Sequence, residues 1–380
     1  MTAPDALSRP RTAFWILAGA LMALSLALPL SGAPEPPPRD FPLPPLILAA
    51  AFLAVGAVGR LDLRRLGLVL ALTVLGWVVV LDTVHRPGIA GSAGAGFWLQ
   101  VLALWLAAWL GTDALATAEP ADPGLRKLLD LAVPLAFGAT VLLLWETLTV
   151  GFGVPAVLLP SPSAILARFA ASLPTLWADF AQTFLKAVLA GWILGCSAGF
   201  LVALLADRVP YLRRGLLPLG NFVAALPVVG IAPIMVMWFG FDWPSKAAVV
   251  VVMTFFPMLV NTGAGLASAG ALERDLMRSY GAGWWTTLLK LRLPAAMPFV
   301  FNALKINATL ALIGAIVAEF FGTPTVGMGF RISTEVGRMS LDMVWAEILV
   351  AAVAGSTSYA LLAGIERVVT FWHPSYRRRE

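Results

Sequence analysis

The sequence is poor in the residues on which much protein chemistry depends. Its 380 residues include one cysteine and two histidines. A single chain therefore cannot form an internal disulfide, and it lacks the cysteines and histidines from which zinc sites are built. Cys196, in "LGCSAGF", is expected to be a small core residue of a helix. His85 and His373 flank apolar runs, which argues against a buried catalytic histidine.

Charge is scarce as well. Only 12% of the residues are charged while 59% are apolar, and the mean hydropathy is +0.86. Soluble domains carry about 25% charged residues. The 14 tryptophans and 28 prolines suit a membrane protein, because tryptophan favours the bilayer interface and proline is tolerated in spanning helices. The composition predicts an all-α, polytopic membrane protein.

Long apolar runs are abundant. A spanning helix needs about 20 mostly apolar residues. Ten runs are candidates: 12–30, 43–59, 66–81, 97–117, 129–150, 184–206, 216–239, 247–265, 297–318 and 345–367. The third is short, and Pro218, Pro227 and Pro233 predict a break or kink in the seventh.

The basic residues orient these runs. With the N-terminus inside, the inner segments hold 18 Lys and Arg, the outer loops hold six, and Lys186 and Lys305 lie within helices, which accounts for all 26. Basic residues favour the cytoplasmic side. The split therefore predicts ten spans with both termini in the cytoplasm. It also explains the pI of 9.7 without nucleic acid.

The first run is also compatible with a signal peptide, since it follows Arg9 and Arg11. Its apolar stretch is long for that role and nine more runs follow, so we expect a retained first helix. A polar, proline-bearing boundary follows the fourth run, in "ATAEPADPGLRK". It predicts an N-terminal extension of about four helices, residues 1–127, and a six-helix part, residues 128–380.

One segment on the predicted inner side is amphipathic, "DLMRSYGAGWWTTLLKLRLP" at 275–294. The spacing of Leu272, Leu276 and Tyr280 predicts a short helix with one apolar face. Gly281 and Gly283 then break it, and a second short helix leads to Pro294. By itself this pattern is also typical of an interfacial helix held at the headgroups by tryptophans and basic residues.

The segment resembles the EAA loop of bacterial ABC importer permeases, which is written Glu-Ala-Ala, three residues, Gly, nine residues, Ile-x-Leu-Pro. The Gly is Gly281 here, the final pair is Leu293-Pro294, and Leu291 takes the Ile place. Residues 275–277, Asp-Leu-Met, stand for Glu-Ala-Ala, so the acid is retained in kind while larger residues replace both alanines.

Further stretches carry the same resemblance. "LPSPSAILARF", "LPVVGIAPIMVMWFGFDWPSK", "FFPMLVNTGAG" and "AEFFGTPTVGMGF" occur in the order found in importers of nitrate, taurine, aliphatic sulfonates and pyrimidine precursors. The resemblance covers about residues 128–376.

This resemblance implies a permease, and not an enzyme, whose residues 270–294, here called the coupling segment, dock on a cytoplasmic ABC ATPase. It implies a periplasmic or lipid-anchored substrate-binding protein, a permease homodimer in membrane lipid, and alternating access. The chain has no G-x-x-x-x-G-K-[ST] loop, so we expect it to bind no cofactor and its partner to bind the ATP. The coupling residues implied are Asp275, Leu276, Met277, Tyr280, Gly281, Trp284, Leu293 and Pro294.

Polar residues inside the apolar runs are candidates for a translocation path. Asn302, Lys305 and Thr309 follow one another at i, i+3 and i+7, and a buried ammonium needs a partner or a watery path. The alternatives are a packing contact or a lysine that snorkels to the inner face. Asn261 and Asn221 are weaker candidates.

On the outer side, Ser161 or Ser163 is placed to cap a short helix that runs through Arg168. This helix is either a contact for the binding protein or a solvated loop element. Glu319 is either part of an outer gate or a structural hydrogen-bonding group, and Glu146 beside Trp145 is expected to be an interfacial charge.

Two other functions fit a polytopic membrane protein. An ion-coupled secondary transporter would use Lys305, Glu319 and Glu146 as relays, but no acidic residue lies in the middle of a run. An intramembrane hydrolase lacks a histidine or an acid–base pair in a span. The substrate expected for an importer is a small organic solute, such as a heterocyclic vitamin or precursor, or a sulfonate.

Overall fold

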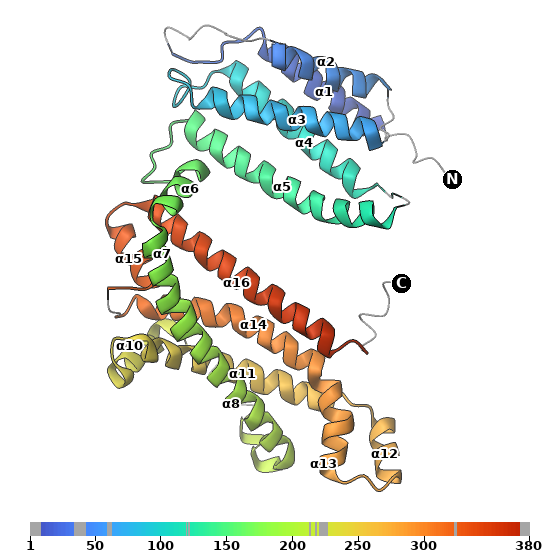
Figure 1. Cartoon of the computed structure of the whole chain (residues 1–380), viewed down its shortest axis with the longest axis vertical. Coiled ribbons are helices and arrows are strands. Elements are labelled where there is room, and N and C mark those ends of the chain that lie inside the picture. Colours follow the sequence, from blue (N-terminus) through green and yellow to red (C-terminus); the bar gives the residue numbers. More distant parts are fainter. Residues whose placement is uncertain are drawn as a thin grey trace. The chain divides into compact units, whose positions relative to one another are not determined.

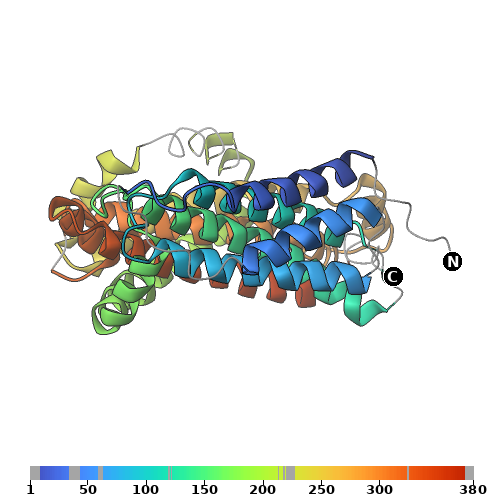
Figure 2. The same ribbon diagram turned by 90° about the horizontal axis from the view of Figure 1, so that it is seen from above.

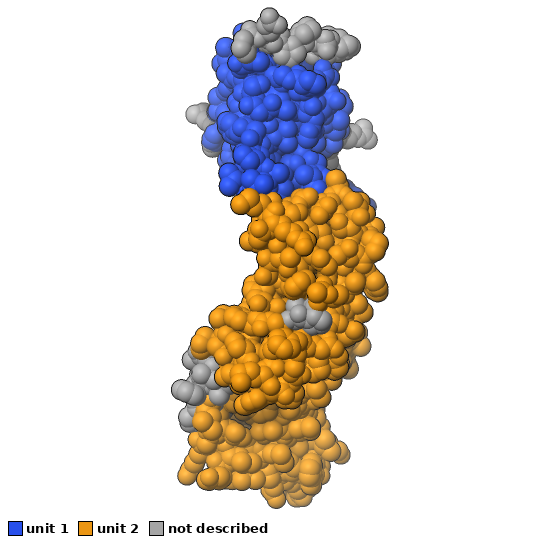
Figure 3. Space-filling model, turned by 90° about the vertical axis from the view of Figure 1, so that its left-hand side faces the viewer, with its two compact units in different colours: residues 1–166 blue, residues 167–380 orange. Residues whose placement is uncertain are grey.

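The computed structural model describes residues 9–33, 43–58, 63–118, 120, 122–212, 214–216, 219, 227–322 and 325–372. Regular structure in these ranges is helical, with one isolated bridge between Ser31 and Ala93. The predicted all-α class is therefore confirmed. The chain divides into two compact units, Met1–Leu166 and Ala167–Glu380, coloured in Figure 3. The functional boundary predicted near residue 127 stays a prediction.

The first unit is a bundle of five long helices that run roughly along one direction (Figures 1 and 2). They are α1 (Arg9–Ser25), α2 (Leu43–Val58), α3 (Leu63–Val84), α4 (Ala95–Ala116) and α5 (Pro123–Gly151). Trp15, Phe52, Phe97 and Leu104 are fully buried between them. Asp122 caps α5 by accepting a hydrogen bond from the Gly124 amide, 2.9 Å away.

The second unit starts within α6 (Pro162–Ala171). In α7 (Leu173–Phe180), the π-helical η1 (Ala181–Val188) and α8 (Leu189–Arg208), the helix continues without a break. Then come α10 (Val228–Phe239), α11 (Trp243–Ala267), α12 (Ala271–Ser279), α13 (Trp284–Thr287), the π-helical η2 (Leu288–Arg292), α14 (Leu293–Glu319), α15 (Met328–Gly337) and α16 (Leu341–Val369). Figure 1 places α12 and α13 at one end of this unit and α10 and α15 at the other.

Helix α11 packs closely against both α8 and α14. Glycines at 191, 195 and 199 line the face of α8 that meets α11. A Cβ at Gly195 would lie on the Thr254 hydroxyl and 2.9 Å from the Val251 carbonyl oxygen. Small residues at this spacing let two membrane helices approach closely. Cys196 is buried beside this contact, as expected for a core residue.

Seven helical stretches in the described ranges are long and apolar enough to cross a membrane. They are Leu66–Val84, Ala95–Ala116, Pro123–Gly151, Leu173–Arg208, Trp243–Ala267, Trp284–Glu319 and Leu341–Val369. The polytopic character is thus confirmed. The run at 66–81 was wrongly expected to be short. Helix α3 has 22 residues because it extends beyond the apolar run at both ends, to Leu63 and to Val84.

Three predicted spans correspond to shorter apolar helices, Thr12–Ser25, Pro44–Ala57 and Val228–Phe239. In the predicted seventh span the helix starts after Pro227, and residues 217–218 and 220–226 lie outside the described ranges. Twelve residues of α-helix are only about 18 Å long, against about 30 Å for a bilayer core. The count of ten spans stays a prediction.

Candidate functional site

The coupling segment folds as two short helices that are separated by a turn. Helix α12 ends at Ser279, Tyr280 is its C-cap residue, and Gly281 follows with φ of +67°. The Gly281 amide donates to the Arg278 carbonyl (2.8 Å) and the Ala282 amide to the Met277 carbonyl (3.0 Å). These two bonds form a Schellman cap, which requires a left-handed residue and therefore favours glycine. The predicted role of Gly281 as the turn residue is confirmed.

An apolar face of α12 has no partner among the residues that the structure describes. Leu272 is 81% exposed, Leu276 55% and Tyr280 81%, so the three side chains that share this face all point away from the bundle. Asp275 and Arg278 form an exposed ion pair (3.5 Å), and Met277 is half-buried. The helix thus presents an apolar strip with a charged rim.

The second half of the coupling segment is embedded in the bundle. Trp284 packs with Leu266, Leu288 and Ala296, and the Arg208 guanidinium lies 5.2 Å from the centre of its ring. Leu293 and Pro294 lie where η2 passes into α14, inside a helical stretch that runs from Trp284 to Glu319. Sequence reasoning placed all eight coupling residues in one segment. It missed the embedding by Arg208 and Leu266, which are distant in sequence.

The predicted polar stripe on α14 divides into two parts. Asn302 and Thr309 lie on the exposed face of α14, with Ile306 and Ile313. Lys305 instead forms an ion pair with Glu366 of α16, with a nitrogen–oxygen distance of 2.6 Å, and its ammonium lies 5.7 Å from the Tyr359 ring centre. Of the two weaker candidates, Asn261 donates to the Pro257 carbonyl of its own helix (2.8 Å), and Asn221 lies outside the described residues.

Asn307 is a buried polar residue that sequence reasoning missed. Its amide nitrogen donates to the Thr254 carbonyl oxygen (2.8 Å) and contacts the Cys196 sulfur (3.2 Å). It therefore joins α14 to α11 and α8. The sequence could have indicated this second polar face. Residues 305 and 307 lie about 200° apart around a helix, so Asn307 cannot belong to the face that carries Lys305.

Glu319 is buried at the α15 end of the unit and serves as a hydrogen-bond acceptor. The Thr183 hydroxyl donates to one carboxylate oxygen (2.8 Å) and the Gly329 amide to the other (2.7 Å). Thr183 also accepts from the Met328 amide (2.8 Å). Of the two expectations for Glu319, this geometry favours the structural hydrogen bonds.

Two further charged residues form buried hydrogen bonds at the α15 end of the second unit. Asp179 is fully buried and accepts from the Gly327 amide (2.7 Å) and from Arg331 Nε (2.8 Å). Lys246, 1% exposed, donates to the carbonyl oxygens of Phe241 (2.6 Å) and Gly322. The first turns of α15 are thus held by carboxylates from α7 and α14.

The α6 end of the first unit holds the predicted serine cap. Ser161 Oγ accepts from the Ala164 amide (3.3 Å), as expected for a helix cap. Ser163 donates from its amide (2.8 Å) and its hydroxyl (2.6 Å) to Glu146, which also bonds His85 (3.0 Å). Glu146 is therefore a buried capping group, and the expectation of a plain interfacial charge was wrong.

Arg168 lies in the second unit, 3.7 Å from the Asp342 carboxylate, and both side chains are partly exposed. Outside the spans, Asp242 caps α11, and the hydrogen bond from the Trp243 amide is the main reason that the pKa of this carboxyl is lowered. In the residues that the structure describes, no group of three or more His, Cys, Asp or Glu side chains could hold a metal ion.

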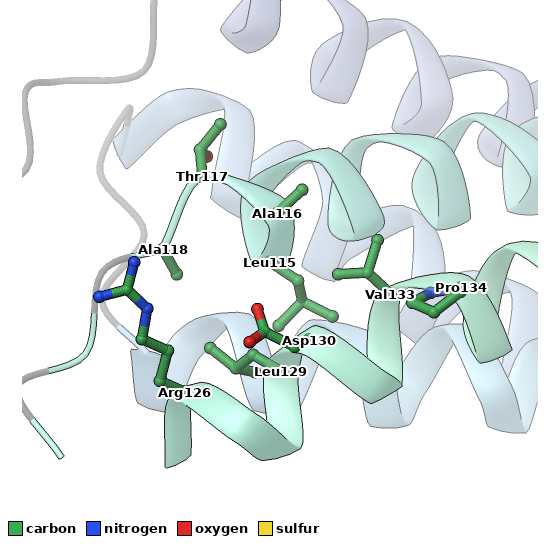
Figure 4. Close-up of a pocket in the computed structure, with 9 residues that line it drawn as sticks. All are labelled: Leu115, Ala116, Thr117, Ala118, Arg126, Leu129, Asp130, Val133 and Pro134. Atoms are coloured by element: carbon green, nitrogen blue, oxygen red, sulfur yellow. The ribbon is translucent and has the colours of Figure 1, made fainter. Parts of the chain in front are cut away.

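A pocket of about 330 Å³ lies in the first unit, between the end of α4 and the start of α5 (Figure 4). Arg126 and Asp130 of α5 contribute its charged groups. None of the residues that sequence reasoning proposed as functional lines it. The candidate site therefore consists of the coupling segment and the helices of the second unit that carry the polar residues described here.

Comparison with known proteins decides the family. Residues 191–370 match the family described as "Binding-protein-dependent transport system inner membrane component". The riboflavin transport system permease protein RibX of Chloroflexus aurantiacus is 30% identical over 260 residues, which are 67% of this chain and 96% of that protein. The chain belongs to this family. It is a transport permease with several membrane-spanning helices.

Two further relatives agree with this assignment. A probable ABC transporter permease protein of Haemophilus influenzae is 31% identical over 220 residues, 58% of this permease and 89% of the relative. The formylaminopyrimidine transport permease protein ThiX of Halalkalibacterium halodurans is 30% identical over 239 residues, 63% of this permease and 95% of the relative. These relatives are nearly fully covered, so about a third to two fifths of this permease is not matched by them.

Proposed function

We propose that this permease forms the membrane path of an ATP-driven importer in the bacterial inner membrane. Two copies enclose the path, and each docks one cytoplasmic ABC ATPase through residues 270–294. A periplasmic or lipid-anchored binding protein delivers the solute to the opposite side. ATP binding closes the ATPase pair, the coupling segments move, and the helix bundles change from inward to outward access. The permease itself makes and breaks no covalent bond.

The exposed apolar face of α12 carries this proposal. Leu272, Leu276 and Tyr280 would cost free energy in water, and their short helix is held by a Schellman cap and rooted by Trp284. A rigid helix with an apolar face and a charged rim suits a groove in another protein. A helix lying loosely on headgroups would need no such rooting.

The test is retention of the ATPase by purified permease. Leu276→Asp places a charge in the middle of the proposed docking face, so ATPase recovery on a permease affinity column should fall at least about tenfold, the effect of roughly 1.4 kcal/mol. Val336→Asp is the matched control, since Val336 is similarly exposed (52%) on α15 at the other end of the unit. Equal ATPase recovery with both variants would contradict the docking role.

The charge distribution supports the orientation. With α12 in the cytoplasm, the opposite end of the second unit carries α15 and α10. This end is the proposed contact for the binding protein. Accessibility of single introduced cysteines to a membrane-impermeant reagent, in a Cys196→Ala background, tests this. Labelling of position 276 from outside intact cells would refute it.

The solute we propose is a flat heterocyclic vitamin or vitamin precursor, because two relatives carry the names of riboflavin and formylaminopyrimidine permeases. The many aromatic residues of this permease are compatible with stacking on such rings. Uptake of labelled riboflavin, a formylaminopyrimidine and taurine by cells that express the complete system separates the candidates. Saturable uptake of taurine alone would move the assignment to the sulfonates.

An ion-coupled secondary transporter is the second candidate, and the intramembrane ion pair of Lys305 with Glu366 is the observation that favours it. Such a transporter needs no ATPase. Solute uptake by liposomes that contain the purified permease alone, driven by a pH gradient, would establish this candidate and exclude the importer.

A further inference from the structure

One ion pair ties the coupling segment to two other helices of the second unit. Arg292 is the last residue of η2 and directly precedes α14. Its two terminal nitrogens donate to the two carboxylate oxygens of Asp207, each at 2.7 Å. Its Nε donates to the Leu266 carbonyl oxygen at 3.1 Å. A single side chain thus contacts the C-terminal ends of α8 and α11.

This contact is stronger and stiffer than an ordinary surface ion pair. The Arg292 and Asp207 side chains are only 15% and 11% exposed. Paired, parallel hydrogen bonds between a guanidinium and a carboxylate fix direction as well as distance. The third bond, to Leu266, leaves Arg292 little freedom to rotate. A lysine at this position would keep the positive charge but could not form the two parallel hydrogen bonds with the carboxylate.

The neighbouring residues support the same connection. Arg208 follows Asp207 and lies over the Trp284 ring, and Trp284 begins the second helix of the coupling segment. Leu204 of α8 packs against the cluster that contains Leu288. The end of α8 is therefore joined to both ends of the stretch 284–292 by a cation–π contact, an apolar contact and an ion pair.

The arrangement has a mechanical consequence. Helix α14 continues the coupling segment without interruption, so movement of the segment reaches α14 through the backbone. Helix α8 has no such covalent link, since its end is separated from the segment by more than 60 residues of chain. It can follow the segment only through non-covalent contacts.

We propose that Asp207 and Arg292 form a strut that makes the C-terminal end of α8 move together with the coupling segment. The proposal rests on the proposed function, in which the coupling segment docks on an ATPase. Arg292 and Asp207 are then positioning residues, which transmit displacement.

The test measures this joint movement directly. Cys196 is replaced by alanine, and spin labels are attached to cysteines at Leu205 of α8 and Leu289 of η2, both exposed (58% and 59%). The distance between the labels is measured in the permease–ATPase complex without nucleotide and with ATP and vanadate. An intact strut predicts a distance that changes by less than about 1 Å, below the usual helix shift of about 1–2 Å.

Two variants break the strut in different ways. Asp207→Asn removes one charge, and the distance should then change by at least about 2 Å on ATP–vanadate trapping, because the segment moves without α8. Arg292→Lys keeps the charge and should give an intermediate change. The exchanged pair Asp207→Arg with Arg292→Asp should restore an unchanged distance. Asp82→Asn is the control, since it breaks an exposed ion pair in the first unit.

The outcomes separate this proposal from the function it rests on. If the ATPase does not co-elute with the unmodified permease, the proposed function fails. If it co-elutes and the distance in the intact permease changes by several ångströms, or stays unchanged in both Asp207→Asn and Arg292→Lys, the strut is refuted. A variant that loses the ATPase altogether also refutes it, since the pair would then hold the docking surface and not transmit its movement.

Discussion

The ion pair between Lys305 and Glu366 provides a quantitative test of how this permease stabilises charge inside the membrane. The nitrogen–oxygen distance is 2.6 Å, and the side chains are 15% and 9% exposed. Replacing Lys305 with methionine keeps most of the aliphatic stem and removes the ammonium. The carboxyl group of Glu366 is then left in a largely buried position without this ammonium.

The expected cost follows from the burial of Glu366. Removing one partner of a buried pair costs about 3–5 kcal/mol, and the slight exposure of this pair favours the lower end of that range. A loss of about 3 kcal/mol lowers the melting temperature of a unit of this size by roughly 6–12 °C. Replacing both residues, Lys305→Met with Glu366→Gln, leaves no unpaired charge and should recover most of that loss.

The assay is thermal unfolding of the purified permease in detergent for the two single variants, the double variant and the control Asp82→Asn. The control breaks an exposed pair, whose contribution is about 0–1 kcal/mol. A double variant that melts as low as the sum of both single variants would refute the reasoning. It would mean that the two side chains act independently and not as a pair.

Three further predictions concern single residues. Gly281→Val forces a side chain into φ of +67°, which costs at least about 1–2 kcal/mol, and should reduce ATPase recovery about fivefold or more if docking needs the Schellman cap. Gly195→Leu overlaps Thr254 and should lower the melting temperature by several degrees, as overpacking costs about 1–3 kcal/mol. Glu319→Gln points an amide donor at the Gly329 amide or at Thr183 and should cost about 1–3 kcal/mol in thermal unfolding.

Sequence reasoning was most successful where the signal is local. The turn at Gly281 and the apolar face of α12 both depend on residues within about one or two helical turns. Propensity, capping and periodicity act over that range, so these features could be predicted. The serine cap of α6 could be predicted for the same reason.

Contacts between distant residues could not be predicted in this way. Asp207 and Arg292 are 85 residues apart, and Thr183 and Glu319 are 136 apart. The residues next to Asp207 and Glu319 in the sequence do not indicate which distant residue each acid bonds. Glu146 was expected to be an interfacial charge because its immediate neighbours suggest one, whereas its environment is made by Ser163 and His85.

The polar contacts of α14 explain why this helix is suited to transmit a displacement. Arg292 just before its start is held by Asp207 and Leu266, and Glu319 at its end is held by Thr183 and Gly329. Asn307 near its middle is bonded to α11. A displacement that reaches α14 therefore moves α8, α11 and the start of α15 with it, since separating any of them would leave buried polar groups without partners.

Helix α16 is held differently, and this suggests where the bundle can open. Its spanning stretch is mostly exposed, and Lys305–Glu366 joins it to α14 near its C-terminal end. An ion pair that is 15% and 9% exposed can exchange its bonds for water more cheaply than the fully buried contacts of Asn307 or Asp179. If α14 and α16 separate in the transport cycle, this pair must break. The double variant Lys305→Met with Glu366→Gln should then retain stability and change the transport rate, whereas a pure packing role predicts that neither changes.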